Sequence, residues 1–361
     1  MSSRTNTAKW DDKRKVWRIV VQREGVVKNF TSSKPGRTGQ REANKKADDW
    51  LDGVLPDKRL KVKEAYEKYK QDQLGRRSTV TDKDIVSKGD NWILPYIGTR
   101  YLDRLTLGDL QEILDDADRQ GKSRKTIRNI RGRLSHFFRY CRQHGWTQLR
   151  TDDLTVSEHA PVKQKQILQK DALYTLFTSS ITTLRGRKVQ DDYINAYRLQ
   201  VLCGLRPGEL LGLKWSDISD GIIHLQRSIN YYGEVTSGKN DNAVRPIVLN
   251  GLMREILHDQ QLITHGQEYV FANIATEQTY LKRWHRYCET NELPRMTVYE
   301  LRHTFVSISA SVLSEGAVKS LVGHSQNMDT FGIYGHDVQG DGEKAAQALE
   351  ERFVQLIRKT C

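Results

Sequence analysis

Three short segments near the C-terminal end of the chain carry side chains that could break and rejoin a phosphodiester bond. They supply, in order, the guanidinium of Arg302, the imidazole of His324 and the phenol of Tyr334. A guanidinium can bind a phosphate, an imidazole can exchange a proton, and an activated tyrosine can attack phosphorus. These groups are the set needed for strand cleavage through a covalent tyrosine intermediate.

A further cation, Arg206, stands in the motif Gly-Leu-Arg-Pro-Gly-Glu-Leu at residues 204–210. Proline is well tolerated at the first position of a helix, so Pro207 predicts that Arg206 lies at a helix N-terminus. There its guanidinium and the exposed backbone amides would form an anion site. The alternative is an arginine that is solvated or paired with a carboxylate such as Glu209.

The segment around Arg302 has the form of a capping box, Thr297-x-x-Glu300, which predicts a helix that begins at Thr297. Tyr299, Arg302 and His303 are spaced three and four residues apart, so they can share roughly one side of that helix. The apolar residues expected on the opposite side are Leu301, Phe305 and Ile308. A Tyr299 that faces the core is the alternative.

The remaining two segments predict a helix end and a movable tyrosine. Gly323 follows an apolar helical pattern, as a C-terminal helix stop does, and so leaves His324 just past the end. Tyr334 is flanked by Gly332 and Gly335, which would permit the movement that a nucleophile needs. A place in the core is the alternative for Tyr334, because its direct neighbours are apolar.

Taken together, these motifs resemble those of the tyrosine recombinase (integrase) family. They appear here as Gly-Leu-Arg-x-Gly-Glu-Leu, Leu-Arg-His-Thr-Phe, Gly-His-Ser and Ile-Tyr-Gly-His. The resemblance implies that Tyr334 attacks the scissile phosphate and forms a 3′-phosphotyrosyl link, while Arg206 and Arg302 bind the phosphate. It also implies that Lys239 is the general acid and that His324 hydrogen-bonds a phosphate oxygen. Because the link stores the bond, neither ATP nor a metal is implied.

The chain departs from the family pattern at two points. Tyr299 stands where most members have a histidine, and a phenol is a poor base at neutral pH. Tyr299 would then only position the phosphate, with the proton taken by His324 or His303. Tyr334 also lies one residue farther from His324 than is most common in the family, so the intervening loop must bulge.

Composition favours a polyanionic partner. The 361 residues include 58 Lys and Arg against 45 Asp and Glu, for a net charge of +13, which favours nucleic acid over membrane. A merely basic protein is the alternative. Neither a long apolar run nor a signal-peptide core is present, so a cytoplasmic protein is expected. The resemblance implies that it is associated with DNA in a bacterial host. The cysteines lack metal-ligand spacing and are expected to be reduced thiols: Cys141, Cys203, Cys288 and Cys361.

The N-terminal part is expected to be a small DNA-binding module. Two β-rich runs, 16–21 and 26–31, meet at Glu24-Gly25, and helical spacing follows over 40–55. The prediction for 1–58 is a three-stranded sheet plus a helix, which the resemblance makes an arm-site DNA-binding domain. The candidate DNA contacts on it are Arg18 and Lys28. A structural cap is the alternative.

Residues 59–156 are predicted to be helical, and the resemblance makes them a core-binding (SAM-like) domain. Thr106 is a candidate helix cap, and a long amphipathic helix is expected over 123–144. Its polar side carries a row of cations suited to tracking phosphates: Arg124, Lys125, Arg128 and Arg131. An ordinary solvated helix face is the alternative.

A polar linker at 157–165 is expected to precede a mixed α/β catalytic domain at 166–361. Strands are predicted at 222–225, 229–235 and 244–249, with Lys239 on the hairpin tip between the last two. Apolar residues at helical spacing over 345–357 predict a tail helix that docks on its own domain or on a neighbour. The fold class is therefore multidomain and mainly α with small β elements.

The resulting hypothesis is a site-specific recombinase that integrates and excises a mobile element at double-stranded DNA attachment sites. A homotetramer that exchanges C-terminal tails is expected on DNA, with an excisionase or a host DNA-bending protein as accessory partner. One alternative is a type IB-like topoisomerase that relaxes DNA with little sequence preference. Another is a catalytically inert DNA-binding regulator.

Overall fold

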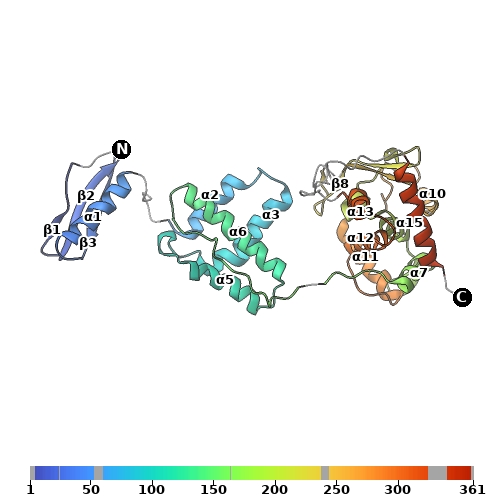
Figure 1. Ribbon diagram of the computed structural model, residues 1–361, viewed down its shortest axis with the longest axis horizontal. Helices are drawn as coiled ribbons and strands as arrows, with labels where there is room; N and C mark the ends of the chain where they lie inside the picture. Colours follow the sequence, from blue (N-terminus) through green and yellow to red (C-terminus); the bar gives the residue numbers. More distant parts are fainter. Residues whose placement is uncertain are drawn as a thin grey trace. The chain divides into compact units, whose positions relative to one another are not determined.

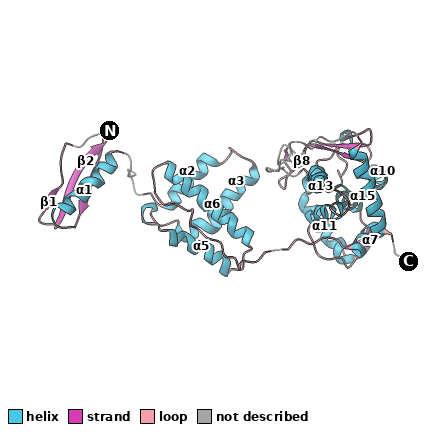
Figure 2. Ribbon diagram, viewed as in Figure 1, coloured by secondary structure: helices cyan, strands magenta, loops and turns pink. Residues whose placement is uncertain are grey.

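A computed structural model describes residues 5–23, 25–52, 60–162, 164–236, 244–323 and 340–358 of the chain. The chain divides into two compact units, Met1–Lys163 and Gln164–Cys361, and the division falls inside the predicted linker. Helices predominate and the strands are short, which confirms the expected fold class (Figures 1 and 2). The first unit contains two separate apolar cores and the second contains one.

The N-terminal module is a three-stranded antiparallel sheet covered by one helix (Figure 1). The strands are β1 (Lys9–Asp11), β2 (Val16–Arg23) and β3 (Val26–Ser32), and the helix is α1 (Gly36–Leu51). Alternate residues of β2 point toward α1, so Ile19 and Val21 are buried with Trp50 while Arg18 and Val20 are exposed. This alternation gives the sheet one covered and one open face.

The helical part of the first unit contains helices of different lengths, three of which begin with a side-chain cap. They are α2 (Val62–Gln73), α3 (Thr79–Lys88), a π-helical turn (Gly89–Ile93), α4 (Leu94–Ile97), α5 (Leu107–Arg119) and α6 (Arg124–Gln143). The side chains of Ser78, Thr106 and Ser123 accept a backbone N–H in the first turns of α3, α5 and α6. The cap expected at Thr106 is therefore confirmed.

The long helix α6 presents an apolar face to this core, as its sequence predicts. The residues of this face are all fully buried: Ile127, Ile130, Leu134, Phe137 and Cys141. Aromatic rings of α2 pack against it, with the Tyr66 and Phe137 centroids 4.9 Å apart. The opposite side of α6 is left to polar and basic residues.

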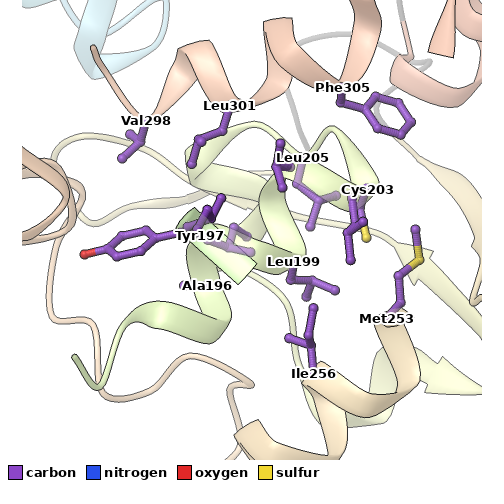
Figure 3. Packing of buried hydrophobic residues seen from close by; sticks show 14 of the residues in the cluster. Ala196, Tyr197, Leu199, Cys203, Leu205, Met253, Ile256, Val298, Leu301 and Phe305 are labelled. Atoms are coloured by element: carbon purple, nitrogen blue, oxygen red, sulfur yellow. The ribbon is translucent and has the colours of Figure 1, made fainter. Parts of the chain in front are cut away.

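The second unit is built around one fully enclosed helix. Its helices are α7 (Lys170–Thr178), α8 (Ile194–Cys203), α9 (Pro207–Leu211), α10 (Gly251–Ile263), α11 (Glu277–Thr290), α12 (Tyr299–Ser309), α13 (Glu315–Val322) and α15 (Asp341–Ile357). Every residue of α8 except Arg198 is buried. Figure 3 shows Leu199 and Cys203 of α8 among side chains of α10 and α12, including Met253 and Phe305. Because α8 packs against both α10 and α12, it holds in place the residues that follow it in the chain.

Three small sheets complete this unit. β10 (Arg245–Val248), β7 (Ile222–Leu225) and β6 (Ile218–Ser219) form one; β8 (Ser228–Ile229) pairs with β9 (Val235–Thr236), and β4 (Ile181–Leu184) with β5 (Arg187–Gln190). The single strand expected over 229–235 is wrong, because the chain turns at Asn230, whose N–H donates to the Glu234 carbonyl at 2.9 Å. The hairpin β4–β5 was not predicted, since each strand is only four residues long.

The last described helix packs on its own domain. Leu349 and Phe353 of α15 are buried, and α15 contacts α7, α12 and β10. The Glu350 carboxylate also accepts the N–H of Leu252 at 3.1 Å. Of the two docking modes expected for this tail, docking on the same domain is the one found in this single chain.

Candidate active site

A sharp turn at the end of α8 places Arg206. Gly204 adopts a φ of 62°, and a Cβ added there would lie 2.2 Å from the Phe305 ring, so glycine is required. Arg206 then occupies the N-cap position of α9, with Pro207 first in the helix, as predicted. Its side chain, however, pairs with a carboxylate: Nη1 lies 2.5 Å from Oε1 of Glu209. The ion-paired alternative for Arg206 therefore holds in this structure.

Glu209 is the centre of a cluster of three arginines. Besides Arg206, it binds both terminal nitrogens of Arg245, at 3.0 and 3.2 Å, and Nη1 of Arg302 lies 3.9 Å from Oε2. Glu209 is only 2% exposed. Burial alone would raise the pKa of its carboxyl group, but the hydrogen bonds and charges of Arg245 and Arg206 lower the pKa below its ordinary value. The carboxylate is therefore held ionised.

Arg302 is the most deeply buried cation of this cluster, at 1% exposed. It donates to the carbonyls of Gly204 at 2.7 Å and Val322 at 2.5 Å. Burial, followed by repulsion from Arg206, lowers the pKa of Arg302 to about 10. The guanidinium therefore remains protonated at neutral pH and can serve as a fixed donor.

The three arginines bind three successive carbonyls at the end of α13. Arg245 Nε donates to Leu321 at 2.7 Å, Arg302 to Val322 at 2.5 Å, and Arg206 Nη2 to Gly323 at 3.2 Å. These carbonyls carry the partial negative charge of a helix C-terminus, which favours cations. Gly323, with a φ of 59°, ends the helix as predicted. The cluster thus gathers at the residue that precedes His324 in the sequence.

The helix that carries Arg302 begins later than predicted. α12 begins at Tyr299, two residues later than expected, although the Glu300 carboxylate still accepts the N–H of Thr297 at 2.6 Å. The guanidinium of Arg302 turns inward to reach the carbonyls of Gly204 and Val322. The predicted start is therefore wrong by two residues, whereas the shared side of Tyr299, Arg302 and His303 stays a prediction.

Tyr299 lies at the surface rather than in the core. It is 41% exposed, and its ring centroid is 5.4 Å from that of His303. The core-facing alternative for Tyr299 is therefore wrong as well. The other predicted catalytic residues, Lys239, His324 and Tyr334, lie outside the described residues, as does Cys361.

Arg245 is a member of the cluster that sequence reasoning missed. It is the first residue of β10 and only 7% exposed. The available signal was an arginine between Val244 and Pro246 in a strand expected to pack on the core, because a buried arginine needs a partner. The sequence alone could not identify Glu209 as that partner.

The predicted DNA contacts on α6 differ in their surroundings. Lys125 and Arg128 are exposed and Arg131 is half-buried. Arg124 donates to the carbonyl of Glu158, so its side chain ties α6 to the segment that leads out of the domain. Lys125, Arg128 and Arg131 therefore stay predicted DNA contacts, while Arg124 also has a bond within the protein.

The two candidates on the N-terminal sheet lie on opposite faces. Arg18 is exposed on the open face, where its Nε donates to Asn29 at 3.0 Å. The ammonium of Lys28 lies 5.4 Å from the centre of the Trp50 ring, on the face covered by α1. Only Arg18 therefore faces away from the helix.

Comparisons with known proteins agree on one class. The model of the phage integrase family matches residues 167–340. A tyrosine recombinase XerC-like protein of Caldanaerobacter subterraneus subsp. tengcongensis is 22% identical over 289 residues, which cover 68% of this chain and 71% of that protein.

Two solved structures share the fold. The Tn1549 transposon integrase in complex with transposon right end DNA matches with a TM-score of 0.64 and 21% identity, over 82% of this chain and 100% of that one. A lambda integrase tetramer bound to a Holliday junction matches with a TM-score of 0.58 and 18% identity, over 92% and 100%.

Residues 167–340 form a domain of the phage integrase family, and the relatives that match the chain include tyrosine recombinases. The chain is accordingly a site-specific DNA strand transferase. Within the described ranges, no helix has both the length and the apolar character that a membrane span requires.

Proposed function

We propose that this recombinase integrates and excises a mobile element, with Tyr334 as nucleophile and with Arg206 and Arg302 as the groups that bind the scissile phosphate. The convergence of these two arginines supports the proposal most directly. They come from separate elements, both contact the end of α13, and both lie within reach of the buried Glu209. A cluster with three cations and one anion is suited to receive a further negative charge.

The bonds that form and break follow from the roles proposed for these residues. The Tyr334 oxygen forms a bond to phosphorus while the bond from phosphorus to the 5′-oxygen breaks, which leaves a 3′-phosphotyrosyl link and a 5′-hydroxyl. Lys239 gives a proton to the leaving oxygen, and His324 hydrogen-bonds a phosphate oxygen. Negative charge grows on the non-bridging oxygens in the transition state, where Arg206 and Arg302 bind it. Attack by a 5′-hydroxyl on the link reverses the step and rejoins the strand.

The position of Tyr299 is consistent with a contact to DNA rather than with packing. Its ring is exposed beside His303, on the outer side of α12. We assign Tyr299 the task of positioning the phosphate. The nucleophile's proton then passes to His324 or His303, because an imidazole accepts a proton at neutral pH more readily than a phenol does.

Assembly on double-stranded DNA attachment sites completes the proposal. The arm-site module at 1–58 and the cations of α6 bind DNA, and four copies assemble by exchanging tail helices, with an excisionase or a DNA-bending protein to set direction. The tail is suited to exchange because its contacts with the domain come from few buried residues, chiefly Ala346, Leu349 and Phe353. Deletion of 343–361 should weaken assembly on DNA while single-site binding remains; unchanged assembly would contradict exchange.

The decisive experiment uses a nicked suicide duplex whose sequence is the end of the mobile element that carries the gene for this protein. Wild-type protein should form a covalent protein–DNA adduct, Tyr334→Phe should form none, and Tyr174→Phe, which alters a tyrosine of α7, should behave as wild type. Equal adduct from Tyr334→Phe would refute the proposal. Relaxation of arbitrary supercoiled plasmid by the wild type would favour the topoisomerase alternative, and site binding without any adduct would favour the inert regulator.

A further inference from the structure

Arg245 is bound more extensively than an ordinary structural ion pair. Its two terminal nitrogens bind the two oxygens of Glu209, and its Nε donates to the Leu321 carbonyl at 2.7 Å. With 7% of its surface exposed, it is almost fully removed from water. Burial of a guanidinium is costly unless its donors are satisfied in good geometry, and here a planar fork meets a carboxylate and a carbonyl together.

The effect of this fork is visible in the distances around Glu209. Oε1 is shared by Arg206 and Arg245, and Oε2 accepts from Arg245, while Nη1 of Arg302 stays at 3.9 Å, beyond hydrogen-bond distance. Without Arg245, the carboxylate would be free to close on Arg302 and to occupy a donor that the phosphate needs. Arg245 therefore restrains the group that competes with the phosphate for the arginines.

Arg245 also connects two elements that approach the site from different parts of the chain. It opens β10, six residues after Lys239 in the sequence, and its bond to Leu321 holds the helix that ends just before His324. We propose that Arg245 is a positioning residue for strand cleavage. It sets the carboxylate of Glu209 and the end of α13 so that Arg206 and Arg302 are aimed at the scissile phosphate. This inference rests on the proposed function of that site.

The test uses the full-length protein and measures two quantities for each variant. These are the dissociation constant for an intact attachment-site duplex and the single-turnover rate of adduct formation on the suicide duplex at saturating DNA. Arg245→Met should lower the rate on the order of 100-fold, comparable with loss of one oxyanion donor. The dissociation constant should change by less than about 3-fold, because the proposed role of Arg245 is to position other residues and not to bind DNA.

Two further variants separate positioning from charge and from folding. Arg245→Lys keeps the charge but cannot reach both the carboxylate and the Leu321 carbonyl, so it should remain roughly 10-fold or more below wild type. Arg227→Met is the matched control, because Arg227 also pairs with a buried carboxylate, Asp217, and reaches a backbone carbonyl, that of Gly212, at 3.4 Å. Its rate at saturating DNA should stay within about 3-fold of wild type.

A double variant tests whether Arg245 acts through the other arginines. If it does, Arg245→Met should slow Arg302→Gln by less than about 3-fold, although it slows the wild type on the order of 100-fold. Additive losses, a wild-type rate in Arg245→Lys, or an equal loss in Arg227→Met would each overturn the inference. Absence of any adduct from the wild type would instead refute the proposed function, so the two failures are distinguishable.

Discussion

The arginines of α6 and those around Glu209 are the same residue type in opposite surroundings. Arg128 faces solvent on the polar side of α6, whereas Arg302 is enclosed and bound to two carbonyls. An exposed arginine keeps its hydration and acts on DNA through a field that salt screens. A buried arginine has already given up its water, so its position is fixed and it acts by geometry.

The difference explains why only one of the two regions needs an acidic residue at its centre. Exposed cations can accumulate along α6 because water and salt screen their mutual repulsion. Two buried guanidiniums, Arg245 and Arg302, and a third that is partly buried require compensation, and Glu209 supplies it together with the carbonyls at the end of α13. On the proposed function, the first region would therefore determine how tightly DNA is held, and the second would determine the chemistry at one phosphate.

The largest effect is expected from removing the shared carboxylate. Glu209→Gln leaves two buried cations and a partly buried one without an anion, so we expect the surrounding structure to lose roughly 3–5 kcal/mol of stability. Hydrogen exchange of the amides of α9 and α13 in the full chain should rise accordingly. Glu255→Gln, on the exposed side of α10, is the control and should leave the exchange unchanged. Equal protection in both variants would show that the cluster does not depend on Glu209.

The next largest effect is expected on the rate of DNA cleavage rather than on stability. Arg302→Gln should raise the barrier to cleavage by ~3 kcal/mol or more, because a fixed cationic donor to the phosphate is lost. The single-turnover rate of adduct formation at saturating DNA measures this change, and the dissociation constant for intact DNA should hardly move. A loss seen mainly in DNA affinity would place Arg302 with the α6 arginines and would remove the distinction between the two regions.

Features that depend on neighbouring residues could be predicted from the sequence. The apolar face of α6, the cap at Thr106 and the stop at Gly323 each follow from residues within one or two helical turns, and the structure contains all three. The family motifs likewise identified Arg206 and Arg302 as a pair. The sequence pattern was therefore sufficient to predict features that depend on residues close in the sequence.

Features that depend on distant partners could not be predicted. Arg245 lies 36 residues from Glu209, and Arg302 lies 98 residues from the Gly204 carbonyl that turns it inward. Helical spacing predicts that Arg302 lies beside Tyr299, but it cannot predict that a tertiary contact turns the guanidinium inward while the Tyr299 ring is exposed. The turn at Asn230 is a different kind of miss, because its signals are local: Asn230 and Gly233 favour a turn within a run whose other residues mostly favour a strand.

A smaller effect is expected from an arginine of α6 that points inward. Arg133 donates to the Tyr69 hydroxyl at 3.1 Å and to Asp84 at 2.7 Å, so it resembles the cluster around Glu209 more than its neighbours on α6. Arg133→Gln should cost about 2 kcal/mol of helical-domain stability, because bonds to a charged group are lost. Hydrogen exchange of α2 and α3 measures this cost. The salt dependence of DNA binding should be unchanged, and a change in it would assign Arg133 to the DNA surface.

The smallest effect on any single step is expected from the outward-facing cations of α6. Replacing Arg128 and Arg131 by glutamine should make the slope of log K against log salt concentration less steep by up to ~2, since each phosphate contact contributes about 0.9. Cleavage at saturating DNA should be unaffected, because neither side chain belongs to the cluster around Glu209.

Arg119→Gln is the matched control for this double variant. Arg119 on α5 is already paired with Glu112 and Asp116, so its replacement should leave the slope unchanged. An unaltered slope in the double variant would mean that this face of α6 is only solvated. In that case affinity would have to come from other cations of the chain, and the contrast between a DNA-holding helix and a phosphate-binding cluster would no longer apply to α6.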